Sequence, residues 1–181
     1  GLPIPDVAPN GVTIDAEMRE HAAAYVAHCR GLNKLDPALA TSQFIETKCN
    51  WYATPEIEIG CKVDYSQIEG DTLYVRDYKY GWRLVDAICN PQLVAYAIGL
   101  VRKLAVEGIT FPPDFKINLG IYQPRPYHPD GPLRTWELTL DELVAEHDEM
   151  VRILKFLTGP LADKLETGSQ CNECPGAVAG T

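Results

Sequence analysis

The sequence has no long apolar run. No stretch approaches the roughly 18–20 consecutive apolar residues that a helix needs to cross a bilayer, so we expect no membrane partner. No basic segment followed by an apolar one comes after the opening Gly1-Leu2-Pro3, which predicts no secretory signal peptide and a cytoplasmic protein. The first residue is not Met, so we expect a fragment or a processed form of a longer chain.

The sequence also has fewer basic than acidic residues. The chain has 16 Lys and Arg residues against 25 Asp and Glu residues, which gives a formal net charge of −9. A chain this acidic is not expected to coat nucleic acid by charge alone. It can still act on DNA locally, because metal ions neutralise both its acidic side chains and the phosphates.

The sequence does have enough apolar material for one folded domain. Its 181 residues are 46% hydrophobic, which excludes disorder as a global state. The six cysteines lie mostly within predicted helices or strands, which favours reduced thiols over a disulfide scaffold.

Residue patterning predicts an α/β fold with a central mixed β-sheet flanked by helices. Asn90-Pro91 is a helix start, and Thr139 with Glu142 forms a capping box for a last helix. We predict a single domain over residues 1–181, with an extended lead-in over 1–12 and a loose, cysteine-containing tail over 159–181. The expected order is helix, three strands, helix, two strands and helix, over residues 13–30, 43–51, 56–65, 72–79, 90–108, 115–123, 134–138 and 139–157.

One predicted strand ends in two opposite charges. With a period of two, Leu73 and Val75 share a face with Asp77 and Lys79. Burying charges at the end of an apolar row is costly unless they are paired or bind a metal. The simpler interpretation is an exposed strand-end salt bridge, worth about 0–1 kcal/mol.

Two neighbouring segments favour a site. Asp64 ends the preceding predicted strand, and a short turn at Glu69-Gly70-Asp71 implies a hairpin that brings Asp64 near Asp77. Two carboxylates, with the backbone carbonyl of Tyr78 as a third ligand, suit Mg²⁺ or Mn²⁺. Gln92 and Tyr96 are four residues apart, so they share one helix face near the same cleft.

These motifs resemble those of the PD-(D/E)XK nuclease superfamily, in its RecB-like exonuclease branch. The resemblance rests on Gly60-x-x-x-Asp64, Asp77-x-Lys79 and Gln92-x-x-x-Tyr96, in that order. A longer match, over residues 75–81, 90–93, 121–125 and 136–138, resembles a phage-associated family in that branch. The resemblance covers roughly residues 55–175.

The resemblance implies a metal-dependent deoxyribonuclease with a restriction-endonuclease-like core, working in phage recombination or DNA processing with DNA and a phage recombination protein as partners. It implies that Asp64 and Asp77 ligate the metal, that Lys79 assists the attacking water and contacts the substrate, and that Gln92 and Tyr96 support the site or the DNA strand. Gln123 and Arg125 end an apolar strand, where they either cap the strand or contact a phosphate of the substrate. A phosphate contact is favoured by Arg because its guanidinium group can donate two hydrogen bonds to phosphate oxygens.

The chain departs from that pattern at both ends. Such nucleases usually carry an acidic or histidine motif on an N-terminal helix, where this chain offers only Glu20 and His21. Relatives often end in a cysteine cluster that holds an iron–sulfur centre. Here the tail has only Cys171 and Cys174, and two ligands do not complete such a site, so we do not expect the cluster in this chain.

Two alternatives for the function of the chain stay open. It is either a catalytically inactive module of the same fold that binds DNA or protein, or a piece of a larger nuclease. Glu58 alternates with apolar residues on a solvated strand and could instead join the metal shell. A glycosidase with paired carboxylates is disfavoured, because such enzymes need no ammonium beside the acid.

Overall fold

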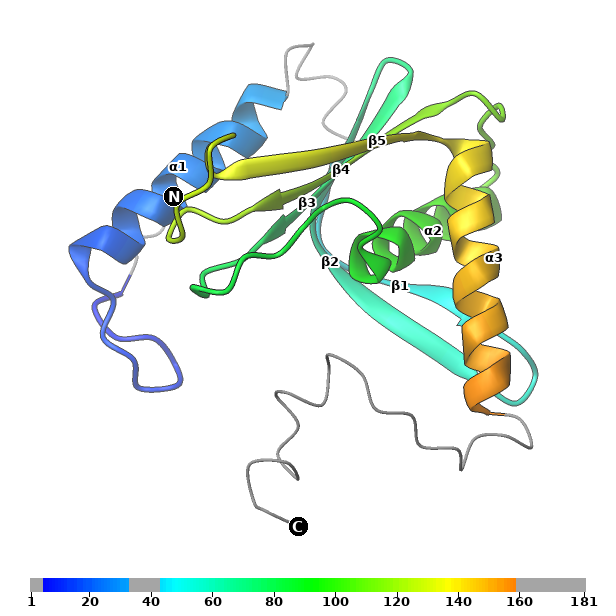
Figure 1. Ribbon diagram of the computed structural model, residues 1–181, viewed down its shortest axis with the longest axis horizontal. Helices are drawn as coiled ribbons and strands as arrows, with labels where there is room; N and C mark the ends of the chain where they lie inside the picture. Colours follow the sequence, from blue (N-terminus) through cyan, green and yellow to red (C-terminus); the bar gives the residue numbers. More distant parts are fainter. Residues whose placement is uncertain (1–4, 33–42, 159–181) are drawn as a thin grey trace. The chain divides into compact units, whose positions relative to one another are not determined.

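Five strands form one mixed sheet in the order β1-β2-β3-β4-β5. The structure is a computed structural model that describes residues 5–32 and 43–158 (Figure 1). Neighbouring strands are antiparallel except β3 and β4, which are parallel and are connected through α2. The elements are α1 (Ala16–Leu32), β1 (Gln43–Ala53), β2 (Glu58–Glu69), β3 (Thr72–Tyr78), α2 (Pro91–Val106), β4 (Lys116–Tyr122), β5 (Leu133–Thr139) and α3 (Leu140–Leu157).

This arrangement confirms the predicted α/β fold, with a mixed sheet flanked by helices. The chain divides into two compact units, Gly1–His147 and Asp148–Thr181, and the whole sheet lies in the first. Both predicted helix starts are confirmed. Asn90 Oδ1 accepts hydrogen bonds from the backbone N–H groups of Gln92 and Leu93. Thr139 Oγ1 accepts one from Glu142 N (3.2 Å), while the Glu142 carboxylate accepts one from Thr139 N (2.8 Å).

The face of the sheet that α2 covers is aliphatic and dry. Leu73 and Val75 of β3 stand opposite Ile117 and Leu119 of β4, and all four side chains are fully buried. The apolar stripe of α2 packs on them, since Leu93, Ala97 and Leu100 are also fully buried. Burial at about 25 cal/mol per Å² of apolar surface makes this layer the main source of stability.

The opposite face, under α1, is aromatic and polar. Tyr25 of α1 contacts the rings of Tyr78 (5.0 Å between centroids) and Tyr122 (5.4 Å). Arg76 lies across β4 on this face, in space that exists because residue 120 is Gly: a Cβ there would lie 2.9 Å from Arg76 Nη1. The two faces of β3 therefore differ in chemistry, although both are covered by a helix.

Two predicted boundaries need correction. The described part of the lead-in predicted over 1–12 is not extended throughout, because Val7 pairs with Thr13 around a turn that contains Gly11 in the left-handed region (φ 84°). The second strand runs on to Glu69, so Asp64 lies inside a strand instead of at its end. The predicted tail over 159–181, with Cys171 and Cys174, lies outside the described residues. Across residues 5–32 and 43–158, no helix is both long and apolar enough to span a bilayer.

Candidate functional site

Four of the five predicted site residues meet at the end of β3. Lys79 Nζ lies 2.9 Å from Asp77 Oδ2 and 3.2 Å from Asp77 Oδ1. It also donates a hydrogen bond to Gln92 Oε1 at 2.9 Å. Gln92 Nε2 donates to Asp77 Oδ1 (3.1 Å) and to the hydroxyl of Tyr96 (2.6 Å). The chain thus builds one connected network from β3 and the first turn and a half of α2.

The N-terminus of α2 explains how Gln92 and Tyr96 reach this network. Asn90 caps the helix and Pro91 supplies its first residue, so the helix begins where β3 and the following loop bring it to the sheet. Residues four apart in a helix project from the same side. Gln92 and Tyr96 therefore both point to the end of the dry face of β3, where Asp77 follows Leu73 and Val75.

Asp64 reaches the same place through a break in the alternation of β2. Cys61 faces α2, with Sγ 3.6 Å from Ala95 O, whereas the hydroxyl of Tyr65 donates to Cys29 O of α1 at 3.1 Å. Residues four apart in a regular strand share a face, so the strand is irregular between them. The residue opposite Asp64 in β1 is Glu46, which has a positive φ of 51° and is skipped in the β1–β2 ladder.

This irregularity places the Asp64 carboxylate beside the end of β3. Pairing of β2 with β3 stops at Tyr65 and Arg76, and Asp64 Oδ2 accepts a hydrogen bond from Tyr78 N at 3.2 Å. Its negative charge is close enough to contribute to the raised pKa of Asp77. The two acids predicted to act together therefore lie in one neighbourhood.

Burial controls the chemistry of Asp77. Only 1% of the residue is exposed, and this desolvation raises the pKa of its carboxyl group above the ordinary value. The hydrogen bond and charge of Lys79 oppose the rise, and Asp64 adds to it. Burial also raises the pKa of the Tyr96 hydroxyl, so Tyr96 is a hydrogen-bonding group and not a base at neutral pH.

The oxygen atoms at this site are of the kind that a hard divalent cation prefers, but the protein offers few of them. Asp77 Oδ2 is buried beside the Lys79 ammonium, and the Tyr96 hydroxyl also interacts with this carboxyl group, while Asp64 offers a second carboxylate and Tyr78 a backbone carbonyl. Within the described parts of the chain, no group of three or more His, Cys, Asp or Glu side chains converges. A cation here would use two carboxylates, a main-chain oxygen and water.

The two residues predicted to contact substrate have different positions. Gln123 is fully buried, and its amide is used up internally: Nε2 donates to the carbonyls of Gly81 (2.8 Å) and Arg83 (2.7 Å), while Oε1 accepts from Val85 N and Arg134 Nη2. Its role is structural, so the predicted substrate contact is withdrawn for Gln123. Arg125 is part-exposed and lies over the rings of Tyr80 and Trp82.

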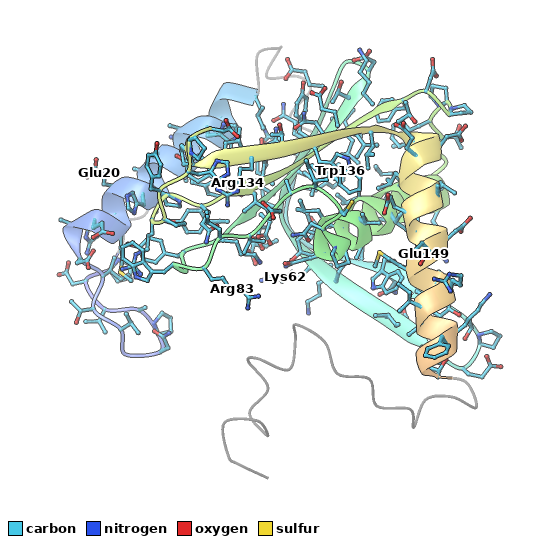
Figure 2. The ribbon with its side chains drawn as sticks, in the orientation of Figure 1. Glu20, Lys62, Arg83, Arg134, Trp136 and Glu149 are labelled. Carbon is cyan, nitrogen blue, oxygen red and sulfur yellow. The ribbon has the colours of Figure 1, made fainter. Side chains whose placement is uncertain are left out.

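The predicted N-terminal motif does not join the site. Glu20 is exposed and lies on the outer side of α1, away from the sheet (Figure 2). His21 packs its ring edge against Tyr80 at 5.8 Å and lies 3.9 Å from Glu17 Oε1. Glu58, considered as a further ligand, is exposed and bonds to Asn50 near the β1–β2 turn.

A cavity beside Asp64 was not predicted from the sequence. This hollow of about 710 Å³ opens between α1 and the strands, and Asp64 and Tyr78 form the part of its wall nearest the network. Tyr25 and Tyr65 contribute aromatic surface, and Glu46 brings a further carboxylate. Tyr78, on the face of β3 opposite Asp77, lines the hollow, but a single tyrosine in a strand is no specific signal of a cavity.

Comparison with known proteins gives a family but no activity. A family model described as a protein of unknown function (DUF2800) matches residues 6–177. No curated protein matches the chain. A solved structure titled "Crystal structure of SSO0001" is 13% identical, with a TM-score of 0.33, and covers 91% of this chain and 76% of that chain. A likeness that weak supports no conclusion about fold or function.

Proposed function

The chain belongs to the family of proteins of unknown function DUF2800, and from its site we propose that it is a metal-dependent deoxyribonuclease. The proposal rests on one observation above all: Asp77, Lys79, Gln92 and Tyr96 form a single hydrogen-bonded network with Asp64 beside it. The order of these residues also resembles that of PD-(D/E)XK nucleases, in the exonuclease branch. That resemblance supports a role in phage recombination or DNA processing, with DNA as the substrate.

Asp64, Asp77 and the carbonyl of Tyr78 would hold Mg²⁺ or Mn²⁺ in this proposal. The bound cation would supply Lewis-acid polarisation of the phosphate and a lowered pKa of bound water. The reaction is attack of water on a DNA phosphodiester, which breaks one P–O bond and releases the sugar oxygen as an alcohol.

The protein's own residues have three tasks. Lys79 places its amine at the end of β3, where its flexible side chain can turn from Asp77 to a phosphate oxygen or a water molecule. Gln92 fixes the position of both Asp77 and Lys79, because its amide bonds to each of them. Tyr96 holds the Gln92 amide in place.

Degradation of linear DNA in Mg²⁺, together with calorimetric titration of Mn²⁺, tests this function. We expect Asp64→Asn and Lys79→Ala each to abolish degradation, and Asp64→Asn also to weaken Mn²⁺ binding, since it removes one of two carboxylates. Asp71→Asn is a matched control, because Asp71 is an exposed acid that pairs with Lys116 at the opposite end of β3. Degradation by both site variants at the wild-type rate would refute the proposal.

A second candidate is a non-catalytic module of the same fold that binds DNA. The small ligand set favours it, since only two carboxylates meet among the described residues. The Mn²⁺ titration separates the two functions. A module without catalysis is expected to bind DNA with no measurable heat from Mn²⁺ and no strand loss.

A further inference from the structure

The loop that follows Lys79 displays an exposed tryptophan. Trp82 is 65% exposed, although indole rings are usually well buried in folded proteins. It comes three residues after Lys79, so their Cα atoms are at most about 11 Å apart along the chain. Stacked nucleotides at about 3.4 Å each would cover that length in about three steps.

Buried hydrogen bonds hold the backbone on both sides of Trp82. Gln123 Nε2 donates to the carbonyl of Gly81 at 2.8 Å and to the carbonyl of Arg83 at 2.7 Å. Gln123 Oε1 accepts from Val85 N at 3.1 Å, so one buried side chain fixes the loop at three points. An exposed ring on an anchored backbone loses little conformational entropy when it binds a ligand.

Positive charge accompanies the ring. The guanidinium carbon of Arg125 lies 4.2 Å from the centroid of the Trp82 ring and 4.7 Å from that of Tyr80, so the cation is held between two aromatic rings. Glu17 approaches Arg125 Nε at 3.6 Å from the side of α1. Arg83, next to Trp82, is exposed and its side chain projects away from the ribbon (Figure 2).

We propose that Trp82, with Arg125 behind it and Arg83 beside it, is a stacking platform for an unpaired base of a single DNA strand that leads to the Asp77–Lys79 site. This inference rests on the proposed function and adds its substrate class. A π-face next to cationic groups is the combination that binds single strands without sequence preference. In an intact duplex the bases are stacked on each other, so the exposed face of Trp82 has no base to receive.

The experiment measures binding of a fluorescein-labelled oligothymidylate of about 15 nucleotides, within the size range of known single-strand sites, by fluorescence anisotropy without divalent metal. The comparison ligand is a duplex closed by hairpin loops at both ends, because the terminal base pair of a blunt duplex would offer Trp82 a free base face. We expect Trp82→Ala to weaken single-strand binding by about 5- to 100-fold, as for loss of one base-stacking partner, and to change duplex binding by less than about twofold. Trp82→Tyr keeps a stacking ring and is expected to restore most of the affinity.

Phe156→Ala is the matched control, because Phe156 is also a large exposed aromatic residue but lies on α3. It is expected to leave both affinities unchanged. One outcome would overturn this inference alone: the wild-type protein degrades DNA in Mg²⁺, but Trp82→Ala binds the oligothymidylate as tightly as the wild type. Trp82 would then be a contact for another protein. Wild-type protein that neither binds nor degrades DNA would overturn the proposed function and the inference together.

Discussion

The two faces of the sheet each bury one charged side chain of β3, but they hold it with different kinds of partner. Arg76 and Asp77 are consecutive in β3, so they point to opposite faces, and both are almost completely buried. Arg76 lies under α1 among tyrosines, and Asp77 lies at the end of the aliphatic layer under α2. Comparing these neighbours shows what distinguishes a structural charge from a candidate catalytic one.

Arg76 is held mainly by backbone carbonyls, with one side-chain partner. Its Nη1 donates to the carbonyls of Val75 and Asn118 (both 2.9 Å), its Nε donates to His28 Nε2 (3.1 Å), and Gly120 leaves the space it fills. Asp77 is held by the flexible ammonium of Lys79 and the side-chain amide of Gln92. A buried charge bound to exchangeable side chains can take a new partner, whereas one bound to the backbone cannot.

The largest effect that sharpens this contrast is expected at Asp77. Asp77→Asn should lower the rate of DNA degradation by at least about a thousandfold, about 4 kcal/mol in the barrier. Its stability should not fall, because the raised pKa shows that burial disfavours the ionised carboxyl in the folded state. Degradation rate and thermal midpoint, measured on the same preparation, check both parts. A large loss of stability would assign Asp77 the structural role that we give to Arg76.

Arg76→Ala should show the reverse behaviour. It leaves Asn118 O and His28 Nε2 without their donor and removes a packed side chain, so we expect a loss of about 3 kcal/mol in the free energy of unfolding. Urea denaturation measures this loss. The degradation rate per folded molecule should stay at the wild-type value, and a rate loss comparable to that of Asp77→Asn would contradict the distinction.

Gly120→Ala should destabilise the fold by crowding the buried side chain of Arg76. The new Cβ would meet Arg76 Nη1 at 2.9 Å and Cδ at 3.0 Å, so we expect a cost of about 1–3 kcal/mol in the free energy of unfolding. A double-mutant cycle with Arg76→Ala isolates the cause. The cost of the added methyl group should largely vanish when Arg76 is absent. Additive costs would mean that the backbone, and not Arg76, requires glycine.

Tyr96→Phe tests how far the network on the Asp77 side depends on its outermost member. The change removes the hydroxyl that accepts from Gln92 Nε2 at 2.6 Å, a bond worth about 1 kcal/mol. We expect about a fivefold loss in degradation rate with the fold intact. Steady-state kinetics should place this loss in kcat, since Tyr96 orders Gln92 and also forms a hydrogen bond with the Asp77 carboxyl group.

The smallest expected effect is a pH dependence on the Arg76 side. Burial, with the Arg76 charge, lowers the pKa of His28. The unfolded chain therefore binds the His28 proton more readily than the folded chain. The contribution of neutral His28 to the free energy of unfolding is fully present above the ordinary pKa of about 6.5, and it is lost as the pH drops below 6.5 toward the lowered pKa of the folded state. His28→Gln keeps an acceptor for Arg76 but does not titrate. Thermal midpoints measured from pH 7 to pH 5 should fall less steeply in this variant than in wild type.

Local sequence patterns predicted most of the fold. Asn90-Pro91 and the Thr139–Glu142 capping box act within one turn of helix, so their geometry follows from neighbouring residues alone. The predicted network of Asp77, Lys79, Gln92 and Tyr96 was also accessible, because strand and helix periodicities set which side chains share a face. The structural role of Gln123 could not be predicted from these periodicities. Its buried position depends on the loop over 79–90 folding back onto β4.

The sequence by itself determined the order of helices and strands and the residues that carry charge at the end of β3, because propensity, capping and periodicity are properties of short segments. The predicted hairpin already brought Asp64 near Asp77, but only the tertiary structure decided how its carboxylate reaches the end of β3, since this needs the irregularity opposite Glu46 and the end of the β2–β3 ladder. It also decided that Trp82 is exposed and Gln123 is buried. Such outcomes depend on contacts between residues far apart in the chain, which no local pattern encodes.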